Sequence, residues 1–186
     1  MVLKRYMMVA AALAVFGMVG CGDQAERILI PVPDESEEAT LVDFSGGSIT
    51  EPSAFDLLAK AAVRTDQFPG WDFLLEFRPD GSPVLWPRSA IIEEDADSGL
   101  QPVAKTFEGL TDAPEDGYIQ LESVAIQVGD VLAVRSRWNP AYGTVRCRLF
   151  AKIEILAIDP GESEMTFRFL VNPNCEKRTL EAGAEE

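Results

Sequence analysis

Cysteine, arginine and carboxylate side chains are the groups whose spacing could support chemistry in this chain, which contains no histidine in 186 residues. The absence of histidine excludes the serine–histidine and cysteine–histidine pairs of nucleophilic enzymes. The motifs G-x-S-x-G, S-x-x-K and G-x-G-x-x-G and the Walker loop are also absent. Paired carboxylates could act as general acid and base, but 31 acidic residues produce such pairs by chance. We therefore expect no enzymatic activity.

Cys21 stands where an apolar N-terminal run ends and a polar chain begins. Lys4 and Arg5 precede this run, which is shorter than the roughly 20 apolar residues of a membrane-spanning helix. The pattern is typical of a signal peptide over residues 1–20. A lone cysteine at such a border could also be a buried thiol or a disulfide partner.

The residues Met18, Val19, Gly20 and Cys21 resemble the lipobox of bacterial lipoprotein signal peptides. In that family a small residue precedes the cysteine, and Met18 stands where leucine is usual. The resemblance implies that Cys21 becomes the lipidated first residue of the mature chain, with palmitate among its acyl chains. Several acyl chains anchor a protein without a spanning helix. The resemblance thus implies an exported protein anchored to a membrane of the bacterial cell envelope, at the periplasmic face or the outer surface.

The mature chain is strongly acidic, because loss of Lys4 and Arg5 changes the formal charge from -15 to -17. Such a charge repels nucleic acid, so no nucleic-acid partner is expected. Proline and acidic residues predict a tether after the signal peptide. The expected division is a signal peptide (1–20), a tether (21–40), a single mainly β domain (41–180) and a flexible acidic tail (181–186).

Alternating apolar and polar residues predict the strands. The clearest run is residues 71–77, in which Trp71 and Phe73 begin an apolar face of period two. Further strands are predicted at residues 41–44, 84–86, 118–128, 131–137, 145–158 and 165–171. Residues 52–62 are the helix candidate, with Pro52 in the first turn. We expect an antiparallel β-sandwich or a partly closed barrel with one short helix.

The last two predicted strands can be paired as a hairpin about Gly161. This register places Ile153 opposite Phe169, so that apolar side chains meet. It places Glu154 opposite Arg168, so that opposite charges meet. Both agreements favour the register.

The same register places Cys147 opposite Cys175, at a spacing that a disulfide tolerates. An oxidising envelope compartment would let the bond form, which leaves Cys21 as the cysteine used for lipid. A metal site is the weaker alternative, since two cysteines without histidine are too few ligands for a usual zinc site.

A basic stretch interrupts the acidic chain. Between Asp130 and Glu154 there is no carboxylate, and this stretch carries Arg135, Arg137, Arg146, Arg148 and Lys152. Agreement of the strand faces would place Arg137 near Arg146 and Arg135 near Arg148. Like charges that face each other on a sheet are destabilising. Either acids from the rest of the domain offset them, or an anionic ligand or partner does.

Two aromatic residues, Trp138 and Tyr142, lie in the loop of this basic stretch. Tryptophan, tyrosine and arginine are enriched in binding hot spots. The candidate partner-binding residues are therefore Arg135, Arg137, Trp138, Tyr142, Arg146 and Arg148. By contrast, Trp71 belongs to a regular apolar face and is predicted to be core, and Trp86 fits either role.

An acidic stretch, residues 93–99, alternates Glu93, Asp95 and Asp97 as oxygen ligands. The glycine and the distal glutamate of an EF-hand loop are both misplaced, however. A solvated acidic loop is the plainer interpretation, and a weak calcium site is the alternative.

Small β-rich envelope lipoproteins, including the HmuY-like haem-binding group, have strand motifs similar to segments over residues 41–172: AFDLL, GWDFLLEF, Gly117–Tyr118 and FAKIEILAI. The resemblance implies a β-rich fold and an envelope location. That family holds haem iron through histidine or methionine, whereas the mature chain has no histidine and only Met165, on the predicted core face. No cofactor is therefore expected.

The expected function is that of a non-enzymatic, lipid-anchored envelope protein whose β domain binds a partner protein or ligand. A carrier of a small hydrophobic, haem-like ligand and a structural envelope component are the alternatives.

Overall fold

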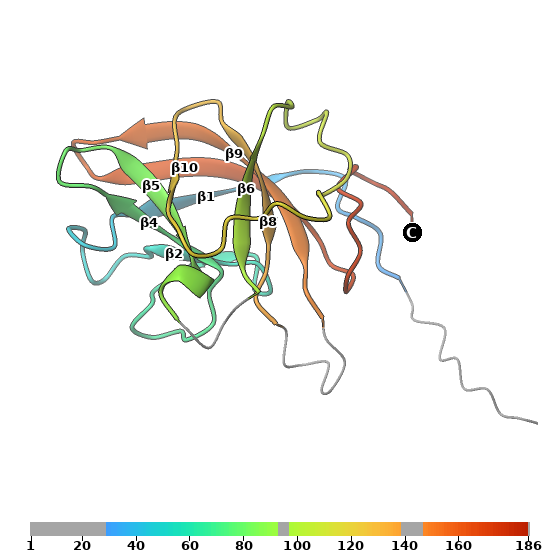
Figure 1. The fold of residues 1–186 in the computed structure, drawn as a ribbon, viewed down its shortest axis with the longest axis horizontal. Helices are drawn as coiled ribbons and strands as arrows, with labels where there is room; N and C mark the ends of the chain where they lie inside the picture. Colours follow the sequence, from blue (N-terminus) through green and yellow to red (C-terminus); the bar gives the residue numbers. More distant parts are fainter. Residues whose placement is uncertain (1–28, 93–96, 139–146, 186) are drawn as a thin grey trace, which may run out of the picture.

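The computed structural model describes residues 29–92, 97–138 and 147–185. Within them the chain forms two five-stranded antiparallel sheets that are not joined into a barrel (Figure 1). Sheet A has the order β1-β10-β9-β8-β6, and sheet B has the order β3-β2-β4-β5-β7. The strands are β1 (Glu37–Val42), β2 (Ala54–Asp56), β3 (Ala61–Val63), β4 (Phe73–Phe77), β5 (Pro83–Pro87), β6 (Gly99–Val103), β7 (Val124–Ala125), β8 (Val131–Arg135), β9 (Phe150–Asp159) and β10 (Glu164–Asn172).

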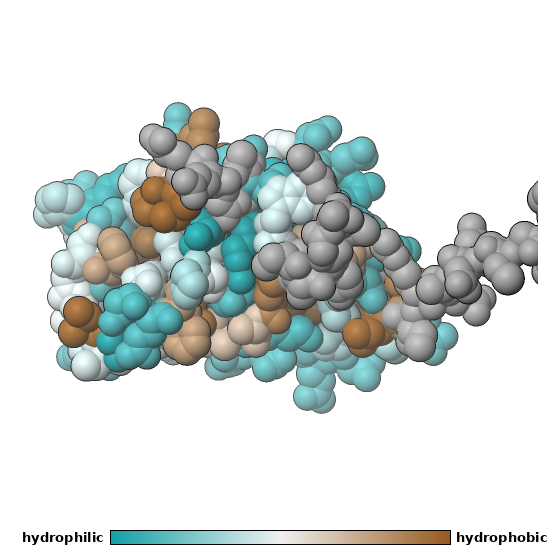
Figure 2. Space-filling model, turned by 90° about the horizontal axis from the view of Figure 1, so that it is seen from below, coloured by the Kyte–Doolittle hydropathy of each residue, from teal (hydrophilic) through white to brown (hydrophobic). Residues whose placement is uncertain are grey.

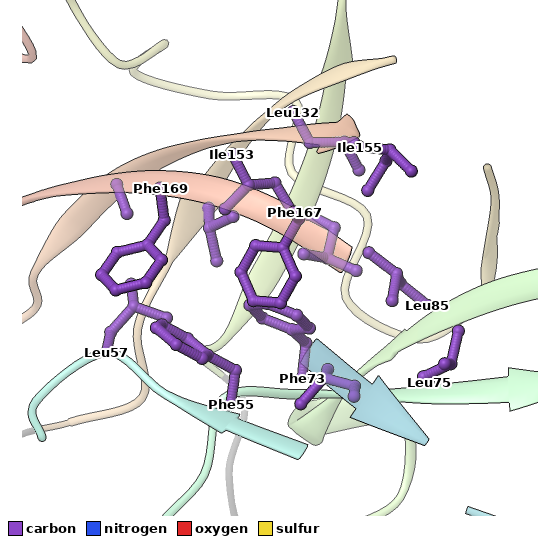
Figure 3. Close-up of a cluster of buried hydrophobic side chains, with 14 of the residues drawn as sticks. Phe55, Leu57, Phe73, Leu75, Leu85, Leu132, Ile153, Ile155, Phe167 and Phe169 are labelled. Atoms are coloured by element: carbon purple, nitrogen blue, oxygen red, sulfur yellow. The ribbon is translucent and has the colours of Figure 1, made fainter. Parts of the chain in front are cut away.

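The main core lies between the two sheets and is centred on four phenylalanines (Figure 3). Phe55 of β2 and Phe73 of β4 meet Phe167 and Phe169 of β10, with ring centroids 4.7 to 5.8 Å apart across the sheets. Burying a large apolar side chain contributes about 1.5–3 kcal/mol, so these rings are a major part of the packing energy. The period-two pattern of the sequence predicted the inner faces of β4 and β10, whereas Phe55 of β2 lies in the segment predicted as a helix.

The predicted register of β9 and β10 is confirmed along most of the hairpin. Ile153 lies opposite Phe169, and Glu154 lies opposite Arg168. The register shifts by one residue between Thr166 and Phe167, close to the turn. Such a bulge adds local twist without moving the core-facing residues beyond it.

The disulfide joins Cys147 and Cys175 beyond the paired ends of these strands, with a Cα–Cα distance of 4.9 Å. This is the pairing that the register predicted. It closes the hairpin at the end opposite its turn.

The helix predicted for residues 52–62 is wrong, and the structure has β2, a turn and β3 in its place. The carboxylate of Asp56 accepts hydrogen bonds from the amides of Leu58 (2.8 Å) and Ala59 (3.3 Å). These bonds stabilise a turn in competition with a helix. The short helical element of the described chain is a 3-10 turn, η1 (Arg88–Ala90).

The strand predicted for residues 118–128 is reduced to β7 and an isolated bridge between Leu100 and Ile119. The bridge lies beside β6, a strand that the alternation did not predict. A Cβ at Gly99 would stand 2.8 Å from the Cβ of Tyr118, so glycine is what lets the two segments approach.

A third layer of loops covers the outer face of sheet A and includes residues of the predicted tether and tail. Val32 is 1% exposed in a second core cluster that also contains Leu180. The amide of Val32 donates to the carbonyl of Ala184 (3.1 Å), and Gly183 donates to Pro33 (3.2 Å). Residues from 29 onward in the predicted tether, and residues 181–185 of the predicted tail, therefore belong to the folded domain.

Candidate functional site

Arg137 lies inside the domain at the junction of the two sheets. It follows β8 of sheet A, and its guanidinium reaches two acids of sheet B: Asp56 on β2 (3.1 Å) and Asp72 just before β4 (3.0 Å). Asp72 is 1% exposed and also accepts hydrogen bonds from the amides of Leu57 and Arg137, both at 2.7 Å. We call Arg137, Asp56 and Asp72 the inter-sheet ion cluster.

Burial and charge act in opposite directions on Asp72. Desolvation raises the pKa of its carboxyl to about 6, although Arg137 and the two backbone amides lower it. The carboxylate is thus largely ionised at neutral pH. Burial lowers the pKa of Arg137, but the charges of Asp72 and Asp56 raise it by more, so the net pKa is raised and this guanidinium remains charged. Asp72 is fully buried in this cluster, and the side chains of Arg137 and Asp56 are each 13% exposed.

Arg148 lies at the same end and is also matched by acids of the domain. Its guanidinium pairs with Glu176 (3.0 Å) and with Asp97 (3.7 Å). It stacks over the ring of Trp138, with 5.6 Å to the ring centroid. Trp138 is half-buried, so this pair presents part of its surface to solvent.

Arg135 takes a different set of contacts on the outer face of sheet A. It stacks on the ring of Tyr118 at 4.8 Å and donates to the carbonyl of Asp97 at 2.8 Å. Its cross-strand neighbours are Gly99 of β6 and Phe150 of β9, and neither is an arginine. The assumed register is therefore wrong, because β8 pairs with β9 two residues away from it. Arg148 still lies close to Arg135: burial and the charge of Arg148 both lower the pKa of Arg135.

The structure thus places four of the six candidate residues at one end of the domain, and two of them, Arg137 and Arg148, are paired with acids. For Arg137 and Arg148, acids from the rest of the domain offset the charge, which is the first of the two interpretations of the basic stretch. Tyr142 and Arg146 lie outside the described residues. Cys21 also lies outside them.

The acidic stretch 93–99 is only partly described, since Glu93 and Asp95 lie outside the described residues. Asp97 is occupied by the ion pair with Arg148. In residues 29–92, 97–138 and 147–185, no group of three potential metal-ligating side chains could hold a metal ion.

A second site, not predicted from the sequence, is a hollow of about 330 Å³ on the outer face of sheet A. Lys152 of β9 lines it and is only 3% exposed. Burial lowers the pKa of Lys152, while Glu108 and Glu181 raise it in part. Strand alternation placed Lys152 opposite the core, but nothing local in the sequence indicates that Phe107 and Leu180 would cover that face.

Comparison with known proteins does not assign this chain to a family. No family model, curated protein or solved structure matches it. Functional inference therefore depends on the residues themselves.

We predict that Asp72 makes stability depend on pH. The ordinary pKa of an aspartate is 3.8 and that of folded Asp72 is about 6, so folding takes up a proton between these values. The contribution of Asp72 to the free energy of unfolding therefore grows as the pH falls from 7 to 5. In urea titrations, the stability of the wild type relative to Asp72→Asn should increase by about 1 kcal/mol over this interval. An unchanged difference would show that the folded carboxyl does not titrate there.

Proposed function

We propose that this protein is a non-enzymatic, lipid-anchored protein of the bacterial cell envelope, whose β-sandwich domain binds a partner protein or ligand. The disulfide between Cys147 and Cys175 carries the proposal. Disulfides persist in oxidising compartments outside the cytosol, which agrees with export. The bond also leaves Cys21 as the remaining cysteine, at the lipobox-like border of the apolar run.

The contacts of the first described residues support an anchor at the disulfide end. The amide of Ile30 donates to the side chain of Asn174 (2.9 Å), and that side chain donates back to the carbonyl of Ile30 (2.7 Å). Asn174 is next to Cys175. The first described residues therefore contact the domain beside the disulfide between Cys147 and Cys175.

Membrane attachment would rest on the lipid. No helix in the described part of the chain combines the length and the hydropathy that a membrane crossing needs.

Binding through a limited surface is favoured over broad apolar contact. In the described part of the face shown in Figure 2, hydrophobic residues lie as separate groups among hydrophilic ones. Among the candidate partner-binding residues, Arg135, Arg137, Trp138 and Arg148 form what we call the arginine end, where Trp138 and Arg148 are stacked and partly exposed. Aromatic and arginine side chains of this kind are frequent hot spots.

A small-ligand carrier is the second candidate function, and the hollow beside Lys152 is the observation that favours it. A haem-like ligand is less favoured than a polar one. Met165 is 0% exposed in the core between the sheets, and the hollow includes charged side chains from both strands of its base.

Replacing Cys21 tests the anchor. The variant Cys21→Ala should move from the membrane pellet to the soluble fraction, because the acyl attachment site is lost. Fractionation of cells followed by immunoblotting measures the change. The double variant Cys147→Ser/Cys175→Ser is the matched control and should stay with the membrane. A Cys21→Ala protein that still pelleted with membranes would refute lipid anchoring.

Replacing Trp138 tests the arginine end. The experiment cross-links the protein to its partner in native membranes and measures the amount of partner recovered. With Trp138→Ala this amount should be at least about tenfold lower than with the wild type, which is the effect of losing a hot-spot residue. Phe68→Ala removes another exposed aromatic side chain and should leave recovery unchanged. Equal recovery with Trp138→Ala would exclude this surface from partner binding.

A further inference from the structure

The hollow on sheet A has two cations at its base, on neighbouring strands. Lys152 of β9 lies opposite Leu170 of β10, and Arg168 is two residues before Leu170. The ring of Phe107 contacts both cations, with its centroid 4.7 Å from the Lys152 ammonium and 4.2 Å from the Arg168 guanidinium. The base is thus cationic with an aromatic wall.

Arg168 is fully compensated by carboxylates. It forms ion pairs with Glu154 and with Glu108, the latter at 2.9 Å. These contacts use Nε and one Nη of the guanidinium. Two carboxylates offset the single positive charge of Arg168, so Arg168 attracts a further anion less strongly than an unpaired cation would.

Lys152 has donors to spare. An ammonium group carries three N–H donors, and in the part of the chain that the structure describes its hydrogen-bond acceptor is the carbonyl of Leu110, at 3.1 Å. The side chain forms no ion pair shorter than 4 Å with a described carboxylate, although it is nearly inaccessible to solvent. A buried charge without an ionic partner is costly. An anionic group that entered the hollow would lower this cost.

The outer edge of the hollow carries the opposite charge. Asp34, Glu108 and Glu181 line it and are exposed, so three carboxylates stand against two cations. A multiply charged anion such as phosphate would be repelled by this edge. A ligand with one negative end toward Lys152 and one positive end toward the edge would match both.

We infer that the hollow binds a small zwitterion with an aminocarboxylate character, its carboxylate on Lys152 and its ammonium near Glu181 and Asp34. The apolar body of the ligand would lie along Phe107 and Leu170. A volume of about 330 Å³ falls in the range of small-molecule sites. The inference rests on the proposed binding function and names the ligand class for this one site.

Three probes of equal chain length test the charge pattern on the unaltered protein. The mature protein in detergent is titrated with each probe by isothermal titration calorimetry. The probe 6-aminohexanoate carries both charges, hexanoate carries only the negative charge, and hexylamine carries only the positive charge. We expect 6-aminohexanoate to bind more tightly than hexanoate and hexylamine not to bind. Inorganic phosphate should not bind either. No binding of 6-aminohexanoate, or binding no tighter than that of hexylamine or phosphate, would overturn the inference.

Variants locate the site. Lys152→Met should weaken 6-aminohexanoate binding by at least about tenfold, the loss expected for one charge-assisted contact. Glu181→Gln, on an exposed residue, should weaken 6-aminohexanoate binding but not hexanoate binding. Lys105→Met removes an exposed lysine outside the hollow and should change neither. Unchanged binding in Glu181→Gln and in a folded Lys152→Met would contradict the site.

The readouts separate this inference from the proposed function. Membrane release of Cys21→Ala does not depend on the hollow. Failure of all three probes with normal membrane anchoring would remove the ligand class and leave the anchored protein. If Lys152→Met does not fold, two measurements still test whether the hollow binds a zwitterion: the comparison of the probes on the wild type, and the binding of 6-aminohexanoate to Glu181→Gln.

Discussion

The inter-sheet ion cluster is the constraint on which the rest of the domain depends. Taking Arg137, Asp56 and Asp72 out of water is costly, and their mutual attraction offsets that cost only while both sheets hold their relative position. The cluster therefore adds little to the net free energy of unfolding. Removing one of its charged partners is costly, because the others stay buried without their counter-charge. It turns Arg137 inward, fixes the turn after β2 through Asp56, and aligns the chain after β8 with the start of β4.

The same end of the domain carries the disulfide and the contact between Ile30 and Asn174. The arrangement uses covalent, ionic and hydrogen-bonded links where the proposed tether joins. It also explains how a basic stretch is tolerated in so acidic a chain, because Glu176 and Asp97 neutralise Arg148 from within the domain. Lys152 is the contrast: it is also buried, but it lines a hollow and pairs with no carboxylate of the residues that the structure describes, which is why it is the centre of the proposed ligand site.

Side-chain alternation predicted what is local and regular. The core faces of β9 and β10, their register at Ile153 and the pairing of Cys147 with Cys175 followed from period two and charge matching. The errors arose where distant contacts decide. Asp56 converts a helix-like segment into a turn, β8 pairs with β9 two residues away from the assumed register, and Arg137 is turned inward by acids 65 and 81 residues away. No local sequence pattern identifies those partners. None indicates that Phe107 and Leu180 cover the face of sheet A on which Lys152 lies.

The most direct test of the inter-sheet ion cluster is a double-mutant cycle between Arg137 and Asp72. Urea unfolding of the wild type, Arg137→Met, Asp72→Asn and the double variant isolates the coupling free energy. Because each single variant leaves a buried group without its partner, we predict a coupling of at least about 2 kcal/mol. Additive effects within about 0.5 kcal/mol would show that the two sheets are not held together through this pair.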